Sequence, residues 1–581
     1  MTTVKPAPIP AEDLAAEIRR QLDAVIDELH AGEARWLASD LASREKLLAS
    51  VSTTVSVAAE RWVQAATRVK RLDRDSQLVG EEWITGPYPV LTGLGALRHS
   101  LAHLSAGESP LTGVQFGSAP GGRISVPILP NSAYEALLLH GFSGEVWMPP
   151  GTTEEDIRSG AGLAQRDPTK SAGVGLVLGA GNITSIPPLD VLYELIANNR
   201  VVVLKLNPVM DDLLSVYSEA LSPLIEYGVL RIVTGGSEVG SYLVNHPGIA
   251  HVHMTGSAAT HDAIVFGSGQ NGRERKAKGT PTLTKPISSE LGGVSPIIVV
   301  PGKWTKRDLR YQAEHLATQR LHNGGYNCIA GQVIVLSKAW PQKDAFLKEL
   351  RRAVATAPSR PAWYPGSDDR IASAKKAYPQ AQHLGVNGER LLIEVGTNDD
   401  PATLETTEFF SPVLGVVTLP DTGQAFLDAA VELANNDFVG TLGANIIADP
   451  RTLKSLGRGF DSAIERLRYG TIAINAWTGL GYLTATAPWG AFPGHTLADI
   501  QSGTGVVHNG LLIDSPERTV VRGPFRPFPR SVLHGEFALF PKPPWFVSAR
   551  SAATTARLLT EFATKPSWRR MPGVFAAAFR A

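Results

Sequence analysis

The chain has 581 residues, of which 55 are Lys or Arg and 55 are Asp or Glu, so its formal net charge is zero. This balance provides no overall field that would favour nucleic acid as a partner, and a small-molecule substrate is expected instead. The length exceeds what one hydrophobic core supports, which predicts several domains, and the single cysteine excludes an intramolecular disulfide and fits a reducing compartment.

Residues 11 to about 75 are expected to be helical. Residues 1–20 lack the apolar core of a secretory signal and pass directly into a charged pattern. From residue 11 to about 75, apolar positions recur three and four residues apart, which is typical of amphipathic helices. The Gly- and Pro-rich stretch 83–101 is expected to be a loop leading into another helix. Because no run of about 18 apolar residues occurs, we expect no membrane span and a cytoplasmic location.

From Gly173 onward, short apolar runs alternate with amphipathic ones. This rhythm predicts parallel strands joined by crossover helices, and therefore an α/β fold with helices on both faces of the sheet. The loops GAGN, KLNP, VTGG and MTGS each follow a predicted strand, so they are expected to border a ligand crevice. A second alternation of the same kind follows residue 295 and predicts a second α/β domain.

The lone cysteine, Cys328, lies in the glycine-rich segment HNGGYNCIAG. Such cysteines are more often small buried hydrophobic residues than nucleophiles, so its chemistry depends on its surroundings. Glu290 precedes it by 38 residues within the segment SELGG. Taken in order over about residues 170–500, these and four further segments resemble the motifs of the aldehyde dehydrogenase superfamily: Gly181-Asn182, VVLKLNP with Lys205, MTGS, and Glu408 to Val413.

The resemblance implies a Rossmann-like cofactor domain, a second α/β catalytic domain with a parallel sheet, and a small β oligomerisation arm. The arm would come from the strand-like segments near 143–175 and 506–521, and it implies a homodimer or homotetramer. We therefore expect four parts: a helical N-terminal extension (1–85), a dinucleotide-binding domain (86–291), a catalytic domain (292–484), and a C-terminal oligomerisation strand with an extension (485–581).

The resemblance also implies an NAD(P)-dependent oxidoreductase that converts a hydrophobic aldehyde to a carboxylic acid. Cys328 would form a thiohemiacetal and then a thioester, Asn182 would donate to the oxyanion, and Glu290 would activate the hydrolytic water. The implied cofactor-binding residues are Lys205, Gly235, Gly240, Thr255, Gly256, Ser257, Leu291, Gly292, Glu408 and Phe410. No metal is expected, because no further ligand follows His251 and His253 at a suitable spacing.

Several positions depart from the family pattern. Pro208 stands where a Glu often binds the adenine ribose hydroxyls, so either NAD or NADP is expected as the cofactor. His261 replaces a glycine, Val294 a lysine and Ser411 a glycine.

Three alternatives stay open. Glu290 favours hydrolysis over transfer to coenzyme A, because a water-activating base would waste the thioester, but a CoA-dependent acylating dehydrogenase or acyl-CoA reductase remains an alternative. A non-catalytic scaffold of the same fold is another. The C-terminal tail mixes Trp and Phe with Lys and Arg, so peripheral contact with a bilayer stays open, although its short apolar runs favour ordinary packing.

Overall fold

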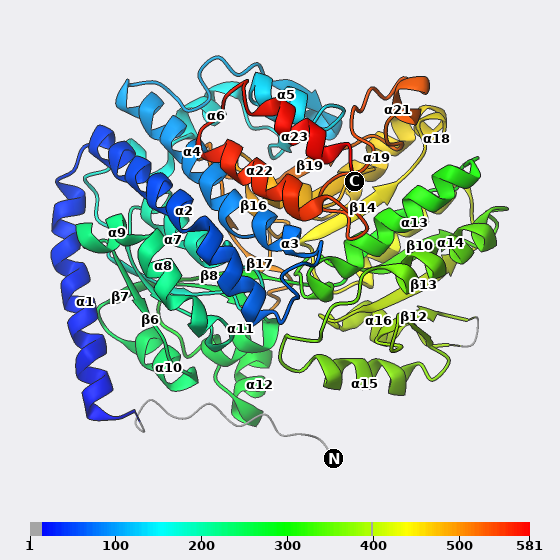
Figure 1. The fold of residues 1–581 in the computed structure, drawn as a ribbon. Helices are drawn as coiled ribbons and strands as arrows, with labels where there is room; N and C mark the ends of the chain where they lie inside the picture. Colours follow the sequence, from blue (N-terminus) through cyan, green and yellow to red (C-terminus); the bar gives the residue numbers. More distant parts are fainter. Residues whose placement is uncertain (1–13, 397–398) are drawn as a thin grey trace.

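The computed structural model describes residues 14–396 and 399–581, which form two large β-sheets with helices on their faces and one two-stranded sheet (Figure 1). The first sheet has six strands in the order β17-β8-β7-β4-β5-β6. Their bounds are β4 (Val174–Leu178), β5 (Val201–Lys205), β6 (Leu230–Val233), β7 (Ile249–Gly256), β8 (Ile287–Leu291) and β17 (Gly503–Thr504). Strands β4 to β8 run parallel and β17 pairs antiparallel with β8, so the predicted Rossmann-like sheet is confirmed.

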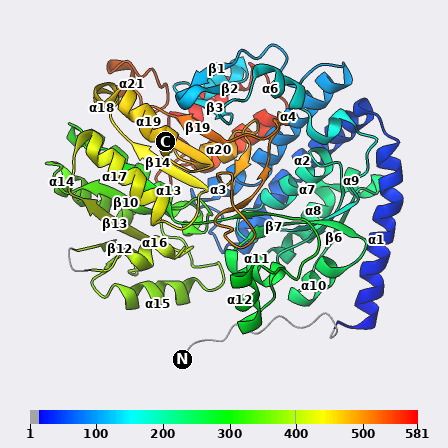
Figure 2. The same ribbon diagram turned by 180° about the vertical axis from the view of Figure 1, so that it is seen from behind.

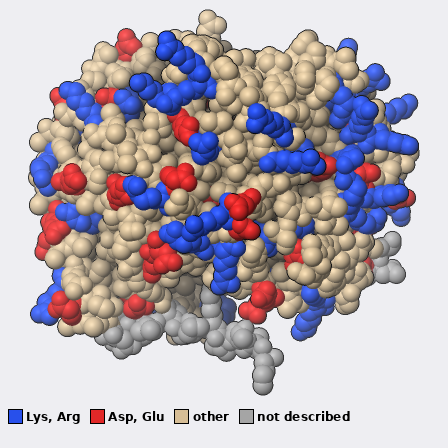
Figure 3. All heavy atoms as spheres, in the orientation of Figure 1, with Lys and Arg blue, Asp and Glu red and all other residues tan. Residues whose placement is uncertain are grey.

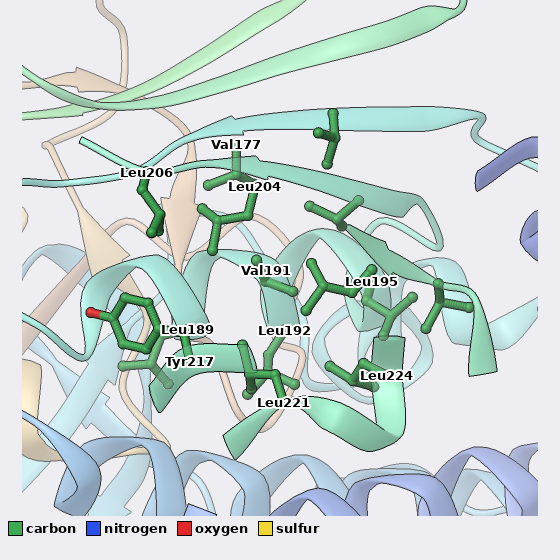
Figure 4. Close-up of a cluster of buried hydrophobic side chains, with 14 of the residues drawn as sticks. Val177, Leu189, Val191, Leu192, Leu195, Leu204, Leu206, Tyr217, Leu221 and Leu224 are labelled. Atoms are coloured by element: carbon green, nitrogen blue, oxygen red, sulfur yellow. The ribbon is translucent and has the colours of Figure 1, made fainter. Parts of the chain in front are cut away.

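Helices follow β4, β5, β6 and β7, as the crossover rule requires for parallel neighbours. They are α7 (Ile186–Ile196), η4 (Pro208–Leu213), α8 (Leu214–Ala220), α9 (Ser222–Tyr227), α10 (Ser237–Asn245), α11 (Ala258–Val265) and α12 (Gly269–Lys278). Figure 4 shows how α7 packs on the sheet: Leu192 and Leu195 lie between Leu204 of β5 and the residues Leu221, at the α8–α9 junction, and Leu224 of α9. Each of these side chains is fully buried, which makes α7 the centre of the core beneath the cavity described below.

Two long N-terminal helices complete this core. Helix α1 (Ala16–Leu37) contacts β5, and α2 (Leu41–Val69) contacts α8. Their buried residues, such as Leu29 and Val55, belong to the same hydrophobic cluster as the sheet. Trp36 also donates a hydrogen bond to the Asn199 side chain, 2.8 Å away. Helix α1 therefore packs on the six-stranded sheet itself, and α2 packs on helices that cover the sheet. Residues 11–13, the start of the range expected to be helical, lie outside the described residues.

The second sheet has eleven strands in the order β1-β2-β3-β19-β15-β14-β9-β10-β13-β12-β11. In this spatial order, the strands β19, β15, β14, β9, β10, β13 and β12 are neighbours that run parallel to one another. Their bounds are β9 (Ser295–Val299), β10 (Gly331–Ser337), β12 (Arg390–Glu394), β13 (Val413–Leu419), β14 (Gly443–Ile447), β15 (Thr471–Ile474) and β19 (Arg518–Arg522). The antiparallel edge strands are β1 (Gly117–Ala119), β2 (Arg123–Leu129), β3 (Ser143–Trp147) and β11 (Gln382–Leu384).

Helices cover both faces of this sheet. Helices α13 (Lys306–Leu321) and α14 (Lys343–Thr356) lie on the face seen in Figure 1, whereas α17 (Gly423–Asn436), α18 (Pro450–Leu456) and α19 (Arg458–Arg466) are seen from behind in Figure 2. Helices α15 (Ser367–Ala377) and α16 (Ala402–Thr406) lie toward the β11 and β12 end. A separate apolar cluster forms on each face, so this sheet is buried as an α/β layer structure.

The segments that resemble an oligomerisation arm join the sheet of their own chain. Strand β3 pairs antiparallel with β19, and β19 pairs parallel with β15. The strand-like segment 506–513 differs from expectation, because only β18 (Val506–Val507) forms, paired with β16 (Trp489–Gly490). His508 and Leu512 have φ values of 61° and 51°, which a strand cannot accommodate.

The expected loop at 83–101 is wrong in its extent, because α3 (Val79–Ile84) and α4 (Pro87–Ser105) occupy most of it. Pro87 and Pro89 stand in the first turn of α4, where backbone N–H groups have no helical acceptor, so these prolines begin the helix rather than prevent it.

The remaining elements are short or C-terminal. They are α5 (Ala133–Leu138), α6 (Glu154–Gly160), α20 (Gly479–Leu483), α21 (Arg530–Leu533), α22 (Ala552–Thr564), α23 (Met571–Ala578), η2 (Pro120–Gly122), η3 (Leu163–Arg166) and η5 (His322–Gly325). Helix α22 packs on α3 and α4, which places the C-terminal region beside residues 79–105 (Figure 1).

Of the helices that the structure describes, none combines the length and apolar character needed to cross a bilayer.

Candidate active site

A cavity of about 1170 Å³ opens at the carboxyl ends of β4, β5 and β7 and reaches Cys328. Eleven of the predicted site residues line it: Asn182, Lys205, Gly240, Thr255, Gly256, Ser257, Glu290, Gly292, Cys328, Glu408 and Phe410. The other two do not. Gly235 forms the turn after β6 with a φ of 128°, and Leu291 is buried against Met254 and Ile500.

The cysteine loop turns sharply after α13. Asn323, Gly324 and Gly325 have φ values of 54°, 71° and 82°, in the region that favours glycine. A Cβ atom at Gly325 would lie 2.8 Å from the carbonyl oxygen of Ser411, so a side chain there has no room. This left-handed turn brings Cys328 back to the cavity wall.

Asn323 holds this turn in place through both its backbone and its side chain. Its N–H donates to Glu81 at 2.9 Å, and its side-chain amide donates to the carbonyl oxygen of Asn182 at 3.1 Å. Its side-chain oxygen accepts hydrogen bonds from Lys70 and Arg360, each at 3.1 Å. The loop is thus tied to the α2–α3 region and to the loop after β4.

Four buried charged residues, Lys70, Glu81, Glu82 and Arg360, form the network behind Asn323. Lys70 Nζ lies 2.8 Å from Glu82, and Arg360 donates to Glu82 at 2.9 Å and also contacts Glu81. Burial raises the pKa of Glu82, but the two cations outweigh burial and hold that pKa below its usual value. Burial raises the pKa of Glu81 and lowers that of Lys70. Sequence reasoning missed this network, because its members are far apart in the chain and belong to no motif.

Asn182 follows β4, as expected from its place in the sequence. Its side-chain Nδ2 donates to the carbonyl oxygen of Tyr326 at 2.9 Å, and the residue lines the cavity. An amide nitrogen carries two hydrogens, so one remains for a ligand. The bond to Tyr326 fixes this donor relative to the loop that carries Cys328.

Glu290 lies near the end of β8, where its side chain is buried and accepts a hydrogen bond from Trp489 Nε1 at 3.0 Å. Burial raises the pKa of this carboxyl to about 7, although the hydrogen bond from Trp489 lowers it. A group with such a pKa can both accept and return a proton near neutral pH.

The thiol of Cys328 faces two carboxyl groups. Burial raises its pKa well above the usual value, and the charges of Glu290 and Glu408 raise it further. The thiol therefore stays protonated at neutral pH unless a base removes its proton. Glu290 is close enough for the thiol to hydrogen-bond to its carboxylate, which makes it the available base.

Glu408 lies on the other side of the site. Burial raises its pKa to about 8, while Arg320 lowers it. Its Oε1 atom is buried without a hydrogen-bond partner, and a Cβ atom at Gly292 would lie only 2.0 Å from that oxygen. The glycine thus leaves room for the carboxylate, whose unsatisfied oxygen faces a cavity wall that could receive a hydroxyl donor.

Lys205 ends β5 at the cavity wall, and burial lowers the pKa of its ammonium group. Within residues 14–396 and 399–581 it makes no hydrogen bond or ion pair, so its donors remain for a ligand. Ser257 caps α11 by accepting from the N–H of Thr260 at 3.2 Å. Pro208, which stands where the family often has a Glu, also lines the cavity.

The other three positions that differ from the family pattern have roles in packing or hydrogen bonding. His261 is buried with Nδ1 3.4 Å from Asp262, and Val294 is buried in the apolar cluster on the α17 face. The carbonyl oxygen of Ser411 accepts a hydrogen bond from the Arg320 guanidinium, which also donates to the carbonyl oxygen of Ala330 in the cysteine loop.

Sequence reasoning missed a polar cluster behind Glu290. The buried Asp190 on α7 accepts a hydrogen bond from Thr255 at 3.0 Å and lies 3.5 Å from His253 and 3.6 Å from His508. The β7–β8 register sets Thr255 directly beside Glu290. In the part of the chain that the structure describes, no group of three or more His, Cys, Asp or Glu side chains is arranged to bind a metal.

Arg370 and Tyr364 were also missed, although both line the cavity. Tyr364 packs edge-on against Phe410, with ring centroids 4.9 Å apart, and Arg370 lies over both rings. Neither residue belongs to a motif quoted from the sequence, and only the fold of residues 360–370 brings them to the cavity.

The sequence model of the aldehyde dehydrogenase family matches residues 166–368. A putative aldehyde dehydrogenase from Staphylococcus aureus (strain MSSA476) is 28% identical over 271 residues, which are 43% of this chain and 51% of the relative. One from strain USA300 is 29% identical over 272 residues with the same coverage. The match thus spans about half the length of these curated relatives.

Solved structures share the fold over most of the chain. The aldehyde dehydrogenase KauB from Pseudomonas aeruginosa aligns with a TM-score of 0.57 and 17% identity, covering 87% of this chain and 89% of that one. The NADP-dependent glyceraldehyde-3-phosphate dehydrogenase from Bacillus halodurans C-125, complexed with NADP, aligns with a TM-score of 0.57 and 18% identity, covering 86% and 91%. At these identities the likeness concerns the fold.

Proposed function

We propose that this chain, a member of the aldehyde dehydrogenase superfamily, oxidises an aldehyde to the carboxylic acid with NAD or NADP as the oxidant. One observation carries the proposal: Cys328, Glu290 and Asn182 meet at one cavity although they come from three separate segments. The rest of that cavity follows the carboxyl edge of a parallel sheet, where α/β folds bind nucleotides.

The chain's own residues account for the covalent steps. Glu290 takes the proton of the Cys328 thiol, and the thiolate attacks the aldehyde carbon to give a thiohemiacetal. The free amide hydrogen of Asn182 supports the developing oxyanion, and a donor of this kind is worth about 3 to 4 kcal/mol of barrier. After oxidation to the thioester, Glu290 releases the thiol proton to solvent and then takes a proton from water as the water attacks the thioester. Glu290 returns this second proton to the departing thiolate, which frees the acid and restores the thiol.

The residues along the cavity suit a dinucleotide. Lys205 offers an unpaired ammonium group and Glu408 an unpaired carboxylate oxygen, which match the hydroxyl groups of a ribose. Gly240 has open space around it, so a ligand can approach the backbone there. A nicotinamide dinucleotide bound in this crevice would supply the hydride acceptor. Pro208 places no carboxylate at the cavity wall, so both NAD and NADP are proposed.

A hydrophobic aldehyde is the proposed substrate. Cys328 packs against an apolar cluster that includes Trp83, Ile329, Trp477 and Phe546. These four side chains are buried and do not line the cavity, but they make the surroundings of the thiol apolar, which favours an apolar substrate at the reacting carbon.

The test is an aldehyde panel with NAD and NADP, each with and without coenzyme A. We expect reduction of the dinucleotide in buffer alone with medium and long aldehydes, and no activity for Cys328→Ser. Turnover that requires coenzyme A would instead identify an acylating enzyme. Failure of the folded protein to bind either dinucleotide in calorimetry would identify a non-catalytic scaffold.

We also propose a cytoplasmic homodimer or homotetramer. The place of the segments 143–175 and 506–521 in the sequence motivates this assembly, although β3 and β19 pair with each other within one chain. Light scattering on the purified chain tests it, and a monomer at micromolar concentration would contradict it.

A further inference from the structure

The C-terminal part of the chain is strongly basic although the whole chain is neutral. Residues 522–581 contain ten basic and two acidic residues. The basic residues are Arg522, Arg526, Arg530, Lys542, Arg550, Arg557, Lys565, Arg569, Arg570 and Arg580, and the acidic ones are Glu536 and Glu561. Such a local excess marks a surface that attracts anions.

Part of this charge is neutralised within the fold. Arg526 and Arg530 pair with Asp308, and Lys542 pairs with Glu314. Among the described residues, the exposed Lys565, Arg569, Arg570, Arg550 and Arg580 form no ion pair. Their charges therefore remain for an external partner.

Exposed apolar side chains gather in the same region. Nine large hydrophobic residues are exposed in the described part of the chain, and five of them lie between residues 532 and 579. They are Val532 at 41% exposure, Leu533 at 78%, Phe537 at 59%, Trp568 at 58% and Phe579 at 48%. Scattered apolar residues are normal on a surface, but a concentration of this kind indicates a contact site.

Aromatic contacts tie two of these residues to neighbouring segments. Phe579 packs against Phe528, with ring centroids 5.8 Å apart, and also against Phe540. On the α5 side, Trp568 packs against Tyr134 with ring centroids 4.5 Å apart. The segment after α5 reaches the neighbour of Phe537, because a Cβ atom at Gly141 would lie 3.2 Å from Ala538.

We call this surface the basic apolar face and define it by Val532, Leu533, Phe537, Lys565, Trp568, Arg569, Arg570, Phe579 and Arg580. It lies over α21, α23 and α5 at the top of the molecule in Figure 1. Figure 3 shows the same view with all atoms: its upper centre consists mostly of uncharged residues, drawn in tan, with separate Lys and Arg side chains, drawn in blue.

We propose that the basic apolar face docks on an anionic lipid bilayer. Exposed Trp, Phe and Leu side chains enter the boundary between headgroups and acyl chains, while unpaired Lys and Arg stay at the level of anionic headgroups. Neither apolar insertion nor electrostatic attraction alone makes a stable membrane contact, but the basic apolar face provides both. The chain lies on the membrane and does not cross it, which agrees with the absence of a spanning helix among the described residues.

A membrane suits the face better than a nucleic acid does. A nucleic acid would use the cations but would leave Leu533 and Val532 exposed, because a phosphate backbone offers these aliphatic side chains no apolar partner. A bilayer contacts both the apolar and the cationic side chains at once. The proposal does not depend on the reaction at Cys328, so it can be tested without an aldehyde.

The experiment is sedimentation of the full-length protein with vesicles of phosphatidylcholine alone or of phosphatidylcholine mixed equally with phosphatidylglycerol. We expect at least tenfold stronger association with the anionic vesicles, and a decrease when salt screens the charges. The apolar variant Leu533→Ser/Trp568→Ser/Phe579→Ser should lose most binding to both vesicles. The charge variant Lys565→Gln/Arg569→Gln/Arg570→Gln should lose the preference for the anionic vesicles.

Matched controls carry the same changes elsewhere on the surface. Val386→Ser removes an apolar side chain that is 81% exposed, and Lys375→Gln/Lys376→Gln removes two exposed cations from α15. Both should bind as the unchanged protein does. The proposal is overturned if the unchanged protein stays in the supernatant with both vesicles, or if controls and test variants lose binding equally. Binding to a single-stranded RNA oligomer in preference to anionic vesicles would also overturn it and identify a nucleic-acid surface.

Discussion

The chemistry of the site depends on where one proton resides between Cys328 and Glu290. The thiol is hard to ionise because it is buried and faces two carboxyl groups, whereas the pKa of Glu290 is raised to about 7. The environment that discourages a free thiolate therefore also prepares the base that can remove the proton. A cysteine of this kind is unreactive at rest and becomes nucleophilic when the carboxylate accepts its proton.

Glu290→Gln should impair both the reactivity of the thiol and turnover. The variant loses the base that accepts the thiol proton, so alkylation of Cys328 by iodoacetamide at pH 8 should slow. Aldehyde oxidation should fall by about 10²- to 10⁴-fold, because no base remains for thioester hydrolysis. Unchanged or faster alkylation would contradict the role of Glu290 toward the thiol, and unchanged turnover would contradict its role in hydrolysis.

The pH dependence of turnover should reflect the same carboxyl group. Glu290 acts as a base in its ionised form, and burial raises its pKa, so activity should be low below pH 7 and rise through about pH 7. The measurement is kcat/KM against pH for the unchanged enzyme and for Glu290→Gln. The variant should lose this inflection, and an inflection near pH 4.5 in the unchanged enzyme would show that the carboxyl is not buried during the reaction.

Gly325→Ala should disrupt the cysteine loop. The added methyl group would lie 2.8 Å from the carbonyl oxygen of Ser411, at a residue whose φ is 82°. We expect a loss of about 1 to 3 kcal/mol in the free energy of unfolding and a large loss of activity, measured by urea titration and turnover. Gly95→Ala is the matched control, since it lies in α4 with open space around it and should stabilise the helix by about 0.5 to 1 kcal/mol.

At the scale of elements, the α2–α3 region and the cysteine loop behave as one unit through buried charges. Lys70 ends α2, Glu81 and Glu82 lie in α3, and Arg360 precedes α15, yet all contact Asn323 or its partners. Helix α3 thereby contributes to the site without touching the cavity.

Lys70→Met should destabilise the protein by about 3 to 5 kcal/mol, because Glu82 loses one of its two buried cations. The free energy of unfolding measures this loss. The exposed pair of Arg61 and Glu219 provides the control, and Arg61→Met should cost about 1 kcal/mol or less. The double variant Lys70→Met/Glu82→Met should recover much of the loss, and equal effects of Lys70→Met and Arg61→Met would contradict the role of the buried network.

The sequence predicted the elements with clear periodicity. The parallel strands of the first sheet and the helices between them agree with the alternation that begins at Gly173. The prediction was wrong where local composition and tertiary context disagree. Prolines suggested a loop at the start of α4, and apolar residues suggested a strand at 506–513, where His508 and Leu512 instead take positive φ values.

At the scale of the whole molecule, both ends of the chain complete the apolar surroundings of the site. Helix α22 packs on α3 and α4, and Trp545 and Phe546 belong to the cluster beside Cys328. The two terminal regions are therefore parts of one core and not separate appendages.

Truncation tests whether the C-terminal region is part of this core. A chain ending at Gly523 keeps every predicted site residue but exposes Trp83 and its neighbours, so we expect strong binding of the dye ANS and a lower unfolding midpoint. A chain ending at Thr564 keeps α22 and should bind much less dye. Equal unfolding midpoints for the full-length chain and the chain ending at Gly523 would show that the C-terminal region is dispensable for the core.

The sequence by itself determined the α/β class, the order of the strands and helices along the chain, and the candidates Cys328, Glu290, Asn182 and Glu408. These follow from local periodicity and from motifs whose spacing is visible in one dimension. Only the tertiary structure decided which distant residues surround them, such as Lys70 and Arg360 behind Asn323, or the buried surroundings that raise the pKa of Glu290. The physical reason is that burial and buried charge pairing depend on contacts between segments hundreds of residues apart, which no local pattern records.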